Sequence, residues 1–597
     1  MIWQICFIIS VVFFLLGFIA LFVKPKRKNK LPTIKPFNLM ILFTALSGFT
    51  MFLPIYAEFF KDTGTQSAQV FKTIILSIHN TLRLFVVDSD FEMINSSVNS
   101  LSPVLRNAYP ILACLLFIVS PLLTFGFILS FFKNAIAFLR YLLAYSKDAY
   151  VFSELNDYAV TLATDIYNNH KKAVIVFTDV YNSEDEDSFE LLERAGEINA
   201  ICFKKDITLV KFNTHSKKAK LMFFILNKTE DENSKAFMHL NKEFNQRENT
   251  EIFLFSKNVI SDLLISSFPN TKIKIRRINY AQSLTYRTLY DNGYELLFKS
   301  AKLDKEGSGK KVISAVVIGL GQYGKAMAKT LAWYCQMDGY KIKINAFDGD
   351  KKAGSIFTSE CPELMDRRYN GVSIPGEAEY SITIHSGINY KTAEFDELIK
   401  SIDDATFVFI SLGSDTVNID CACKLRTLFE RYGVKPIIST IVYDSDQKEA
   451  LLNAENFKHQ KYDFHFIGGI DTTYSEAVII DSELEDDALS RHLKYGSEED
   501  FWKYEYNYRS SSASALHMKA RIKCGMKGAD KKEENLTAEE RDIIENLEHK
   551  RWNAYMRSEG YVYNEKRNDL GKTHHNLVKF NDLSEEDKRK DSRVGSK

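Results

Sequence analysis

Three glycines follow a short apolar run and form the motif in this chain with the most definite chemistry. Gly319, Gly321 and Gly324 come directly after the run 312–318, which has the composition of a buried strand. Glycines at this spacing give a tight turn into a helix and let backbone amides approach a phosphate at the helix terminus. The spacing therefore predicts a phosphate-binding turn.

Two acidic residues complete the motif. Asp348 and Asp350 follow a second expected strand, 343–347, at a distance from the glycines where a carboxylate is expected to bind a ribose hydroxyl. Strand, turn and acid together predict a site for NAD or another adenine nucleotide, bound as a regulatory ligand. The alternative is a glycine-rich turn that packs tightly and binds nothing.

Polar and aromatic side chains are concentrated near the carboxyl end. The candidate binding residues are His549, Arg551, Trp552, Arg557 and His574. Such a set suits an anionic, stackable ligand such as a nucleotide, through charge-assisted hydrogen bonds and cation–π contacts. The alternative is that Trp552 belongs to the core, with His549 and Arg551 as its polar rim. No metal site is predicted, because adjacent histidines rarely point at one ion and no third ligand is evident.

The elements that position these residues follow from the pattern after residue 148. Short apolar runs alternate with amphipathic stretches, which is typical of parallel sheets covered by helices on both faces. Candidate strands are 150–152, 173–178, 200–203, 221–226 and 251–255, then 312–318, 343–347, 406–410 and 436–441. The pattern predicts two tandem α/β Rossmann-like units.

The two units differ at the turn after their first strand. Superposing the two starts places Ser153, Leu155 and Tyr158 at the three glycine positions. Glu154 and Asp157 would repel a phosphate there. We therefore expect the first unit to keep the fold without binding a dinucleotide at this turn.

A polar, mainly helical region follows the second unit. Thr537 and Glu540 have the spacing of a capping box, and Gly560 suits a helix end. A helix is therefore expected from Thr537 to Gly560. The fold class is thus multidomain, with an N-terminal α-helical transmembrane region, two Rossmann-like units and a small, mainly α module. The expected boundaries are 1–148 for the transmembrane region, 149–305 and 310–480 for the Rossmann-like units, 481–535 for a helical connector and 536–597 for the last module.

Long apolar runs before residue 135 predict three membrane-spanning helices, at about 2–23, 37–60 and 109–132. The basic loop 24–30 replaces a cleavage site and is expected to stay in the cytoplasm. This places the N-terminus outside, and the large soluble region in the cytoplasm. A multi-pass protein of the plasma (inner) membrane is the prediction.

The loop between the second and third spans contains an amphipathic or pore-like segment at 66–92, which ends in an acidic turn with Asp88 and Asp90. One interpretation is a re-entrant pore loop, because acidic rings favour cations. The other is a helix lying on the outer surface. No Gly-Tyr-Gly filter is present, so the transported ion stays open. Pro121 and Gly126 are the candidate gate positions, since both can let a helix bend.

The membrane hairpin followed by two Rossmann units, with its 319–324 motif, resembles channels and transporters gated by RCK domains, the regulators of potassium conductance. The resemblance covers roughly 150–480. It implies potassium or other ion transport, a ring of units beneath a pore, and a homotetramer.

The segment from Glu548 to Asn553, with Tyr561, Arg567 and His574, resembles the RyR repeat, the small helical module named after ryanodine receptors. Modules of this kind joined to RCK-type units imply a nucleotide second messenger and a setting in antiviral defence.

Composition excludes several other functions. The net charge is zero and no basic, aromatic-rich stretch is present, so no nucleic-acid partner is expected. The eight cysteines include no Cys-x-x-Cys pair.

The expected function is a ligand-gated ion channel or ion-transport protein that contacts lipid, inorganic ions and a nucleotide-type molecule, and not an enzyme. The alternatives are a membrane-anchored NAD-dependent oxidoreductase and a non-conducting regulatory subunit of an ion transporter.

Overall fold

The computed structural model describes residues 2–22, 36–86, 88, 91–180, 187–256, 265, 272–305, 307–366, 368–369, 372–373, 380–452, 454–457 and 460–595. The chain divides into two compact units, Met1–Ala137 and Phe138–Lys597, called here the N-terminal unit and the C-terminal unit.

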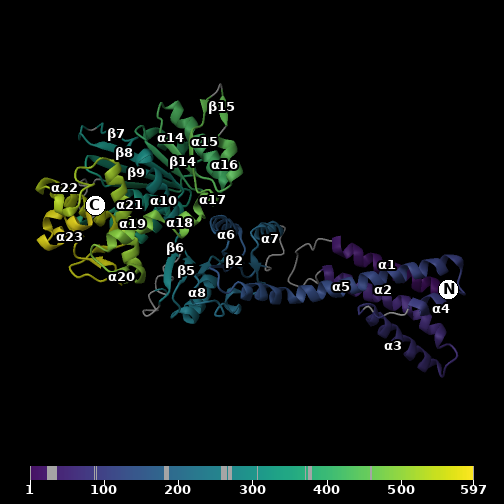
Figure 1. Ribbon diagram of the computed structural model, residues 1–597. Coiled ribbons are helices and arrows are strands. Elements are labelled where there is room, and N and C mark those ends of the chain that lie inside the picture. The colour runs from purple at the N-terminus through teal and green to yellow at the C-terminus, as the bar shows by residue number, and fades with distance from the viewer. Residues whose placement is uncertain are drawn as a thin grey trace. The chain divides into compact units, whose positions relative to one another are not determined.

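Helices alone make up the described part of the N-terminal unit. They are α1 Ile2–Phe22, α2 Pro36–Phe59, α3 Gln66–Leu84, α4 Phe91–Val98 and α5 Pro103–Leu143, whose last residues belong to the C-terminal unit. Three of them are long and apolar enough to cross a membrane, at Ile2–Ile19, Leu39–Phe59 and Pro103–Phe125. The third was expected at 109–132, but α5 begins earlier and ends later. α1 and α2 lie side by side (Figure 1), and the Ser10 and Ser47 hydroxyls bond across them at 3.0 Å.

The helix α3 packs with its polar face inward. Thr73, Ser77, Asn80 and Thr81 are buried. The apolar stripe on the opposite face is exposed, with 67% of Phe71 accessible. The exposed stripe also includes Ile74, Ile75, Ile78 and Leu82. In a soluble protein the apolar face would be the one that packs, so this arrangement requires an apolar environment around α3.

Two six-strand parallel arrays form the centre of the C-terminal unit. The first sheet has the order β3-β2-β1-β4-β5-β6, and the second has the order β12-β9-β8-β13-β14-β17 with β7 added beside β8. All strand pairs along both orders are parallel. This is the strand order of a dinucleotide-binding Rossmann sheet. The two α/β sheets predicted from the alternating pattern are therefore present.

The strands of the first sheet are β1 Ala149–Phe152, β2 Val174–Phe177, β3 Ile201–Cys202, β4 Leu221–Ile225, β5 Thr250–Phe255 and β6 Lys274–Ile278. Those of the second are β7 Lys302–Leu303, β8 Lys311–Ile318, β9 Tyr340–Asp348, β12 Tyr380–Ser386, β13 Phe407–Ile410, β14 Ile437–Ile441 and β17 Phe464–Ile467. Every predicted strand is present. The prediction missed β6, β7, β12 and β17. β6 and β12 carry charged or hydroxyl side chains where a continuous apolar run was sought, β7 has only two residues, and His465 interrupts the short apolar run of β17.

The connecting helices are α6 Asp157–Asn169, α7 Asp187–Glu197 and α8 Glu230–Phe244 in the first array, α10 Tyr280–Gly293 between the sheets, and α11 Gln322–Tyr334, α12 Ala353–Glu360, α13 Pro362–Met365, α14 Ala393–Ser401, α15 Asp415–Arg431 and α16 Ser445–Leu452 in the second. Two short hairpins, β10 Arg368–Tyr369 with β11 Val372–Ser373 and β15 Glu455–Phe457 with β16 Gln460–Lys461, project from the second array.

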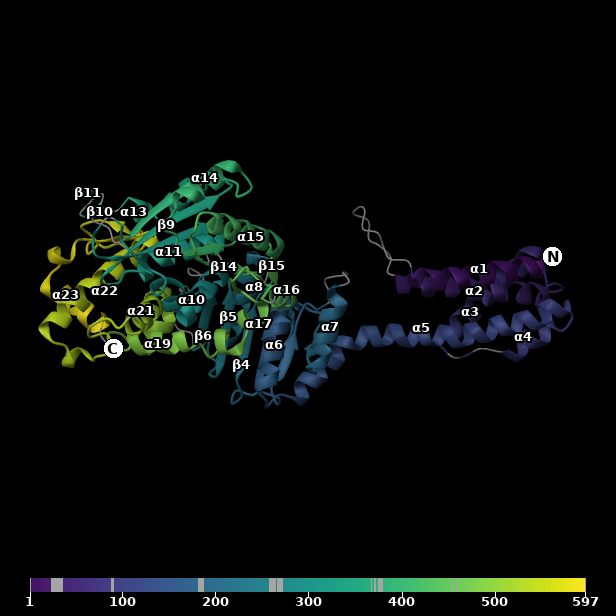
Figure 2. The same ribbon diagram turned by 90° about the horizontal axis from the view of Figure 1, so that it is seen from above.

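The chain ends in a helical region that shares a core with the second sheet. Its elements are α17 Ile470–Thr473, α18 Glu476–Ile479, α19 Glu483–His492, α20 Glu498–Lys503, α21 Glu505–Lys523, α22 Ala538–Ser558, β18 Val562–Tyr563, β19 Thr573–His574 and α23 Glu585–Gly595. The ring of Trp333 on α11 lies 5.9 Å from that of Tyr555 on α22, inside one apolar cluster. Helices α22 and α23 lie side by side in both views (Figures 1 and 2).

The last turn of α5 packs against the segments that surround the first sheet. Arg140 donates from Nη2 to the carbonyl of Asn199 at 2.9 Å. Tyr141 is fully buried and its ring lies 5.4 Å from His215 and 5.5 Å from Phe212. These contacts lie within the C-terminal unit, to which the last residues of α5 belong.

Candidate functional site

The glycine turn sits between β8 and β13, where the strand order reverses. Gly319 has φ +86°, and a Cβ there would lie 2.4 Å from the carbonyl oxygen of Ser411. A Cβ on Gly324 would lie 1.7 Å from the carbonyl oxygen of Gly319. These two glycines are required by the packing of the turn, whatever it binds.

Gly321 is different, because a Cβ there meets no atom within 4 Å and its φ of −63° suits any residue. The open space lies at the first residue before α11, where backbone amides are available to an anion. Asp348 accepts the amide N–H of Leu320 at 2.6 Å and that of Asp350 at 2.7 Å. The carboxylate predicted to bind ribose therefore also holds the turn in place, and each oxygen keeps a lone pair for a ligand hydroxyl.

In the first sheet the corresponding turn is filled by side chains. The Ser153 hydroxyl accepts the amide N–H of Leu226 at 3.0 Å. Tyr158 stacks against Tyr474 with 4.7 Å between ring centroids. These contacts occupy positions where glycines leave room in the second sheet.

A cavity of about 270 Å³ lies among α21, α22 and α23. Four of the predicted binding residues line it: His549, Arg551, Trp552 and His574. The structure thus brings together residues from α22 and from β19, which are about 25 positions apart in the sequence. This volume approaches the lower end of the range for small-molecule sites.

Arg551 carries the charge of this cavity. It is 1% exposed, and Nε and Nη2 bond to Glu548 Oε1 at 3.1 and 2.6 Å. Its Nη1 has no hydrogen-bond partner among the residues that the structure describes. A buried guanidinium N–H without a partner is costly, so an acceptor at this point would be bound favourably.

Three buried arginines surround Glu548. Arg521 pairs with its Oε2, and Arg491 lies behind, 7% exposed. Arg491 and Arg521 also donate to the carbonyls of Val594 and Gly595 at the end of α23. Burial raises the pKa of Glu548, but Arg551 and Arg521 outweigh this effect and lower it to about 2. Asp591 on α23 is a second carboxylate close enough to interact with Arg551 and Arg521.

Aromatic rings form the wall opposite Arg551. The centroids of Trp552 and His574 are 4.9 Å apart, and the rings of His574 and His575 stack at 5.0 Å. His574 Nδ1 accepts the amide N–H of Asn576 at 3.0 Å, and burial lowers the pKa of His574 to about 4. The ring is therefore neutral at pH 7 and presents Nε2–H as a donor.

Arg557 does not line this cavity. It donates from Nη1 to Asn553 Oδ1 at 2.9 Å, and its Nε lies 3.8 Å from Glu363 Oε2. Arg551 and Arg557 are six residues apart, so they point about 120° away from each other around α22. The sequence pattern grouped them, but the helix separates them.

Sequence reasoning missed several residues that complete the cavity and its charge cluster. Arg491, Arg521, Lys590 and Asp591 come from α19, α21 and α23. Asp591 Oδ2 lies 3.3 Å from His549 Nδ1. No local motif connects these helices, and only their packing brings the residues together. Among the described residues, no group of three or more His, Cys, Asp or Glu side chains could hold a metal ion.

The pore and gate candidates lie in the N-terminal unit. Asp88 is exposed and pairs with Arg83, with 2.8 Å between Oδ1 and Nη2. Asp90 lies outside the described residues. Pro121 lies within α5, which continues through it, and the side chains near Gly126 in the same helix lie outside the described ones.

We predict that Glu548→Gln lowers the free energy of unfolding by about 3–5 kcal/mol at pH 7, because it leaves buried arginines without their carboxylate. A carboxylate with a lowered folded pKa stabilises above its unfolded pKa and loses this effect as the pH falls. The difference between the two proteins should thus shrink from about pH 4.5 to about pH 2. Denaturant unfolding of both proteins across this range measures it, with Glu539→Gln on the exposed first turn as the control.

We also predict that Gly321→Val leaves the fold intact and abolishes binding of NAD or another adenine nucleotide at the glycine turn. The added side chain enters open space, so only a ligand would meet it. Calorimetric titration with NAD and ATP, together with thermal unfolding, checks both parts. Undiminished nucleotide binding by a folded Gly321→Val protein would contradict the assignment.

No family model matches this chain, and no curated protein matches it in sequence. A proposal for its function therefore starts from the geometry of these sites.

Proposed function

We propose that this protein is a ligand-gated ion channel or ion-transport protein whose C-terminal unit senses a nucleotide-type small molecule. The resemblances to RCK and RyR modules point the same way, and they imply assembly as a homotetramer in the plasma membrane with the C-terminal unit in the cytoplasm. The observation that carries the proposal is the buried Nη1 of Arg551, without a partner among the described residues, in a cavity walled by aromatic rings.

The chemistry of the cavity defines the ligand class. Arg551 Nη1 is the group that could donate to an anion, and Arg567 and Lys590 add positive charge to a lining that also holds Glu548, Asp587 and Asp591. Trp552 and His574 offer ring faces and edges within one ring diameter of each other. Phosphate and a purine or pyrimidine base supply both features in one molecule. A nucleotide satisfies this combination more completely than a simple anion or an apolar ligand.

The ion pathway is proposed from the position of α3. Thr73 Oγ1 lies 3.4 Å from the carbonyl oxygen of Tyr56, near the end of α2. Further along α3, Leu84 lies beside Gly48, since a Cβ on Gly48 would be 2.8 Å from Leu84 Cδ1, and Gly48 is in the middle of the apolar span Leu39–Phe59. With α2 across the bilayer, α3 runs from the outer surface to about the bilayer centre. Its exposed apolar stripe then faces lipid.

This arrangement favours the re-entrant loop over a helix lying on the surface. The Arg83–Asp88 pair follows directly after α3. Charged groups at this depth are costly and usually face a water-filled path. We therefore place the pair on the ion pathway, where the oligomer would bring its copies together.

Coupling between ligand and pathway would run through α5. The helix is continuous from Pro103 to Leu143, and its last turn packs on the first sheet. Moving a closed pathway from 1:99 to 99:1 needs a differential affinity of about 5.5 kcal/mol in total. Shared among four subunits, this is about 1.4 kcal/mol each, which one charge-assisted hydrogen bond to Arg551 can supply.

We predict that Arg551→Lys abolishes or weakens by about tenfold or more the response to the activating nucleotide, because lysine keeps a charge beside Glu548 but cannot present Nη1. The measurement is ion flux from liposomes that contain the full-length protein, screened against a panel of mono-, di- and cyclic nucleotides.

The matched control is Arg541→Lys on the exposed start of the same helix, which should respond as the wild type does. If the folded Arg551→Lys protein responds as the wild type does, the cavity is not the site that senses the nucleotide. Absence of flux with every nucleotide would favour a non-conducting subunit. Hydride transfer from NADH to an acceptor would favour the oxidoreductase.

A second expected outcome concerns the pathway. Asp88→Asn removes the carboxylate that pairs with Arg83, and we expect it to lower the permeability ratio of cations to anions in the same liposomes. Asp62→Asn, in the turn between α2 and α3, is the control. Equal ratios for wild type and Asp88→Asn would place the pair away from the ion pathway.

A further inference from the structure

A second cleft lies where the first sheet, the second sheet and the C-terminal helices meet. Its outer part has a volume of about 540 Å³ and its inner recess about 80 Å³. The two share five lining residues, so they lie next to each other. The shared residues are Arg277, Asn279, Gln282, Tyr286 and Arg509.

The first sheet, the second sheet and the C-terminal helices all contribute residues to the lining of this cleft. Arg277 comes from β6 of the first sheet, and Lys325 and Lys329 come from α11 beside the second sheet. Arg509 comes from α21, and Lys572 follows α22. A molecule bound here would contact every module of the unit.

The outer cleft is basic. Lys325 and Lys329 share one carboxylate, that of Glu360, with 2.8 Å between Lys329 Nζ and Oε2. The ammonium groups of both lysines lower the pKa of Glu360 although burial opposes the shift. Lys572 donates to the carbonyl of Glu559 at 2.7 Å, so its charge has no carboxylate of its own among the described contacts. Cations therefore outnumber carboxylates along this wall.

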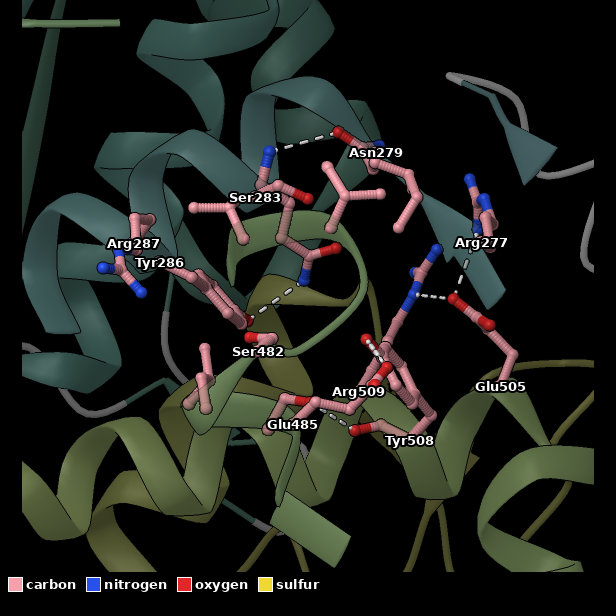
Figure 3. A pocket seen from close by; sticks show the side chains of 16 residues that line it. Arg277, Asn279, Ser283, Tyr286, Arg287, Ser482, Glu485, Glu505, Tyr508 and Arg509 are labelled. Carbon is pink, nitrogen blue, oxygen red and sulfur yellow. Dashed lines mark hydrogen bonds and ion pairs between the residues drawn. The ribbon is translucent and has the colours of Figure 1, made fainter. Parts of the chain in front are cut away.

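The inner recess is built from buried polar groups. Arg277 and Arg509 both point toward Glu505 (Figure 3), at 3.7 and 2.7 Å. The Arg277 side chain is 2% exposed. Tyr286 accepts from Gln282 Nε2 at 3.1 Å, and Ser283 and Ser482 lie along the same recess in Figure 3. The recess thus offers donors and acceptors to a compact polar group.

We propose that this cleft is a third ligand site, beside the glycine turn and the Arg551 cavity, which binds a phosphate or diphosphate ester with the phosphate beside Lys325 and Lys329. Lys325, Lys329 and Lys572 bring three positive charges against the one carboxylate of Glu360, which suits a ligand with two negative charges. The recess would hold the ester's polar substituent.

Binding would stabilise the arrangement of the two sheets and the C-terminal helices, including the first sheet that packs on α5. The site is distinct from the Arg551 cavity, which lies among α21, α22 and α23. It would regulate the response to the ligand of that cavity.

The test is calorimetric titration of full-length protein with inorganic pyrophosphate, in the wild type and in Arg551→Lys. We expect binding in both, and about tenfold or greater weakening when Lys325→Gln and Lys329→Gln are combined. The matched control combines Lys235→Gln and Lys242→Gln on α8, which should bind as the wild type does.

Hydrogen exchange gives a second readout. Pyrophosphate should slow exchange in 322–334 and 505–523 together, also in the Arg551→Lys protein. Absence of pyrophosphate binding in Arg551→Lys would overturn the proposal and assign the anion to the other cavity. Binding that survives the Lys325 and Lys329 substitutions would overturn it as well.

Discussion

The C-terminal helices are organised around one buried carboxylate among three arginines. Glu548 pairs with Arg521 and Arg551, and Arg491 and Arg521 extend the cluster to the last carbonyls of α23. Buried charges are tolerated only when they are paired and hydrogen-bonded. The cluster therefore fixes the relative positions of α19, α21, α22 and α23. Arg551, whose Nη1 has no hydrogen-bond partner among the described residues, is also one of the residues that line the cavity.

The two sheets of the C-terminal unit have the same fold but differ at the turn after their first strand. Both sheets have the same strand order, but Gly321 leaves open space at the turn of the second sheet while Ser153 and Tyr158 fill that of the first. The filled turn makes the first sheet a packing partner. Through Arg140 and Tyr141 it also receives the end of α5. The sheet whose first turn is filled by side chains is thus the one that contacts the last turn of α5.

Sequence periodicity predicted the features that depend on short segments of the chain. It missed the features that depend on contacts between distant segments. The glycine turn, the capping box at Thr537 and Glu540, and most strands follow from patterns within short segments. Charged residues such as Arg276 and Arg277 concealed β6, since their burial depends on partners from distant helices. The apolar stripe of α3 was visible in the sequence, but which face packs against α2 was not. The same limit grouped Arg557 with a cavity that it does not line.

We propose that an anion completes the arginine cluster beside two aromatic rings. Cryo-electron microscopy of the full-length protein with the nucleotide that activates flux would locate this anion. We expect density for a phosphate within hydrogen-bonding distance of Arg551 Nη1 and for a base against Trp552 or His574. Density for the nucleotide at another place, with Arg551 and the rings unoccupied and unmoved, would contradict it.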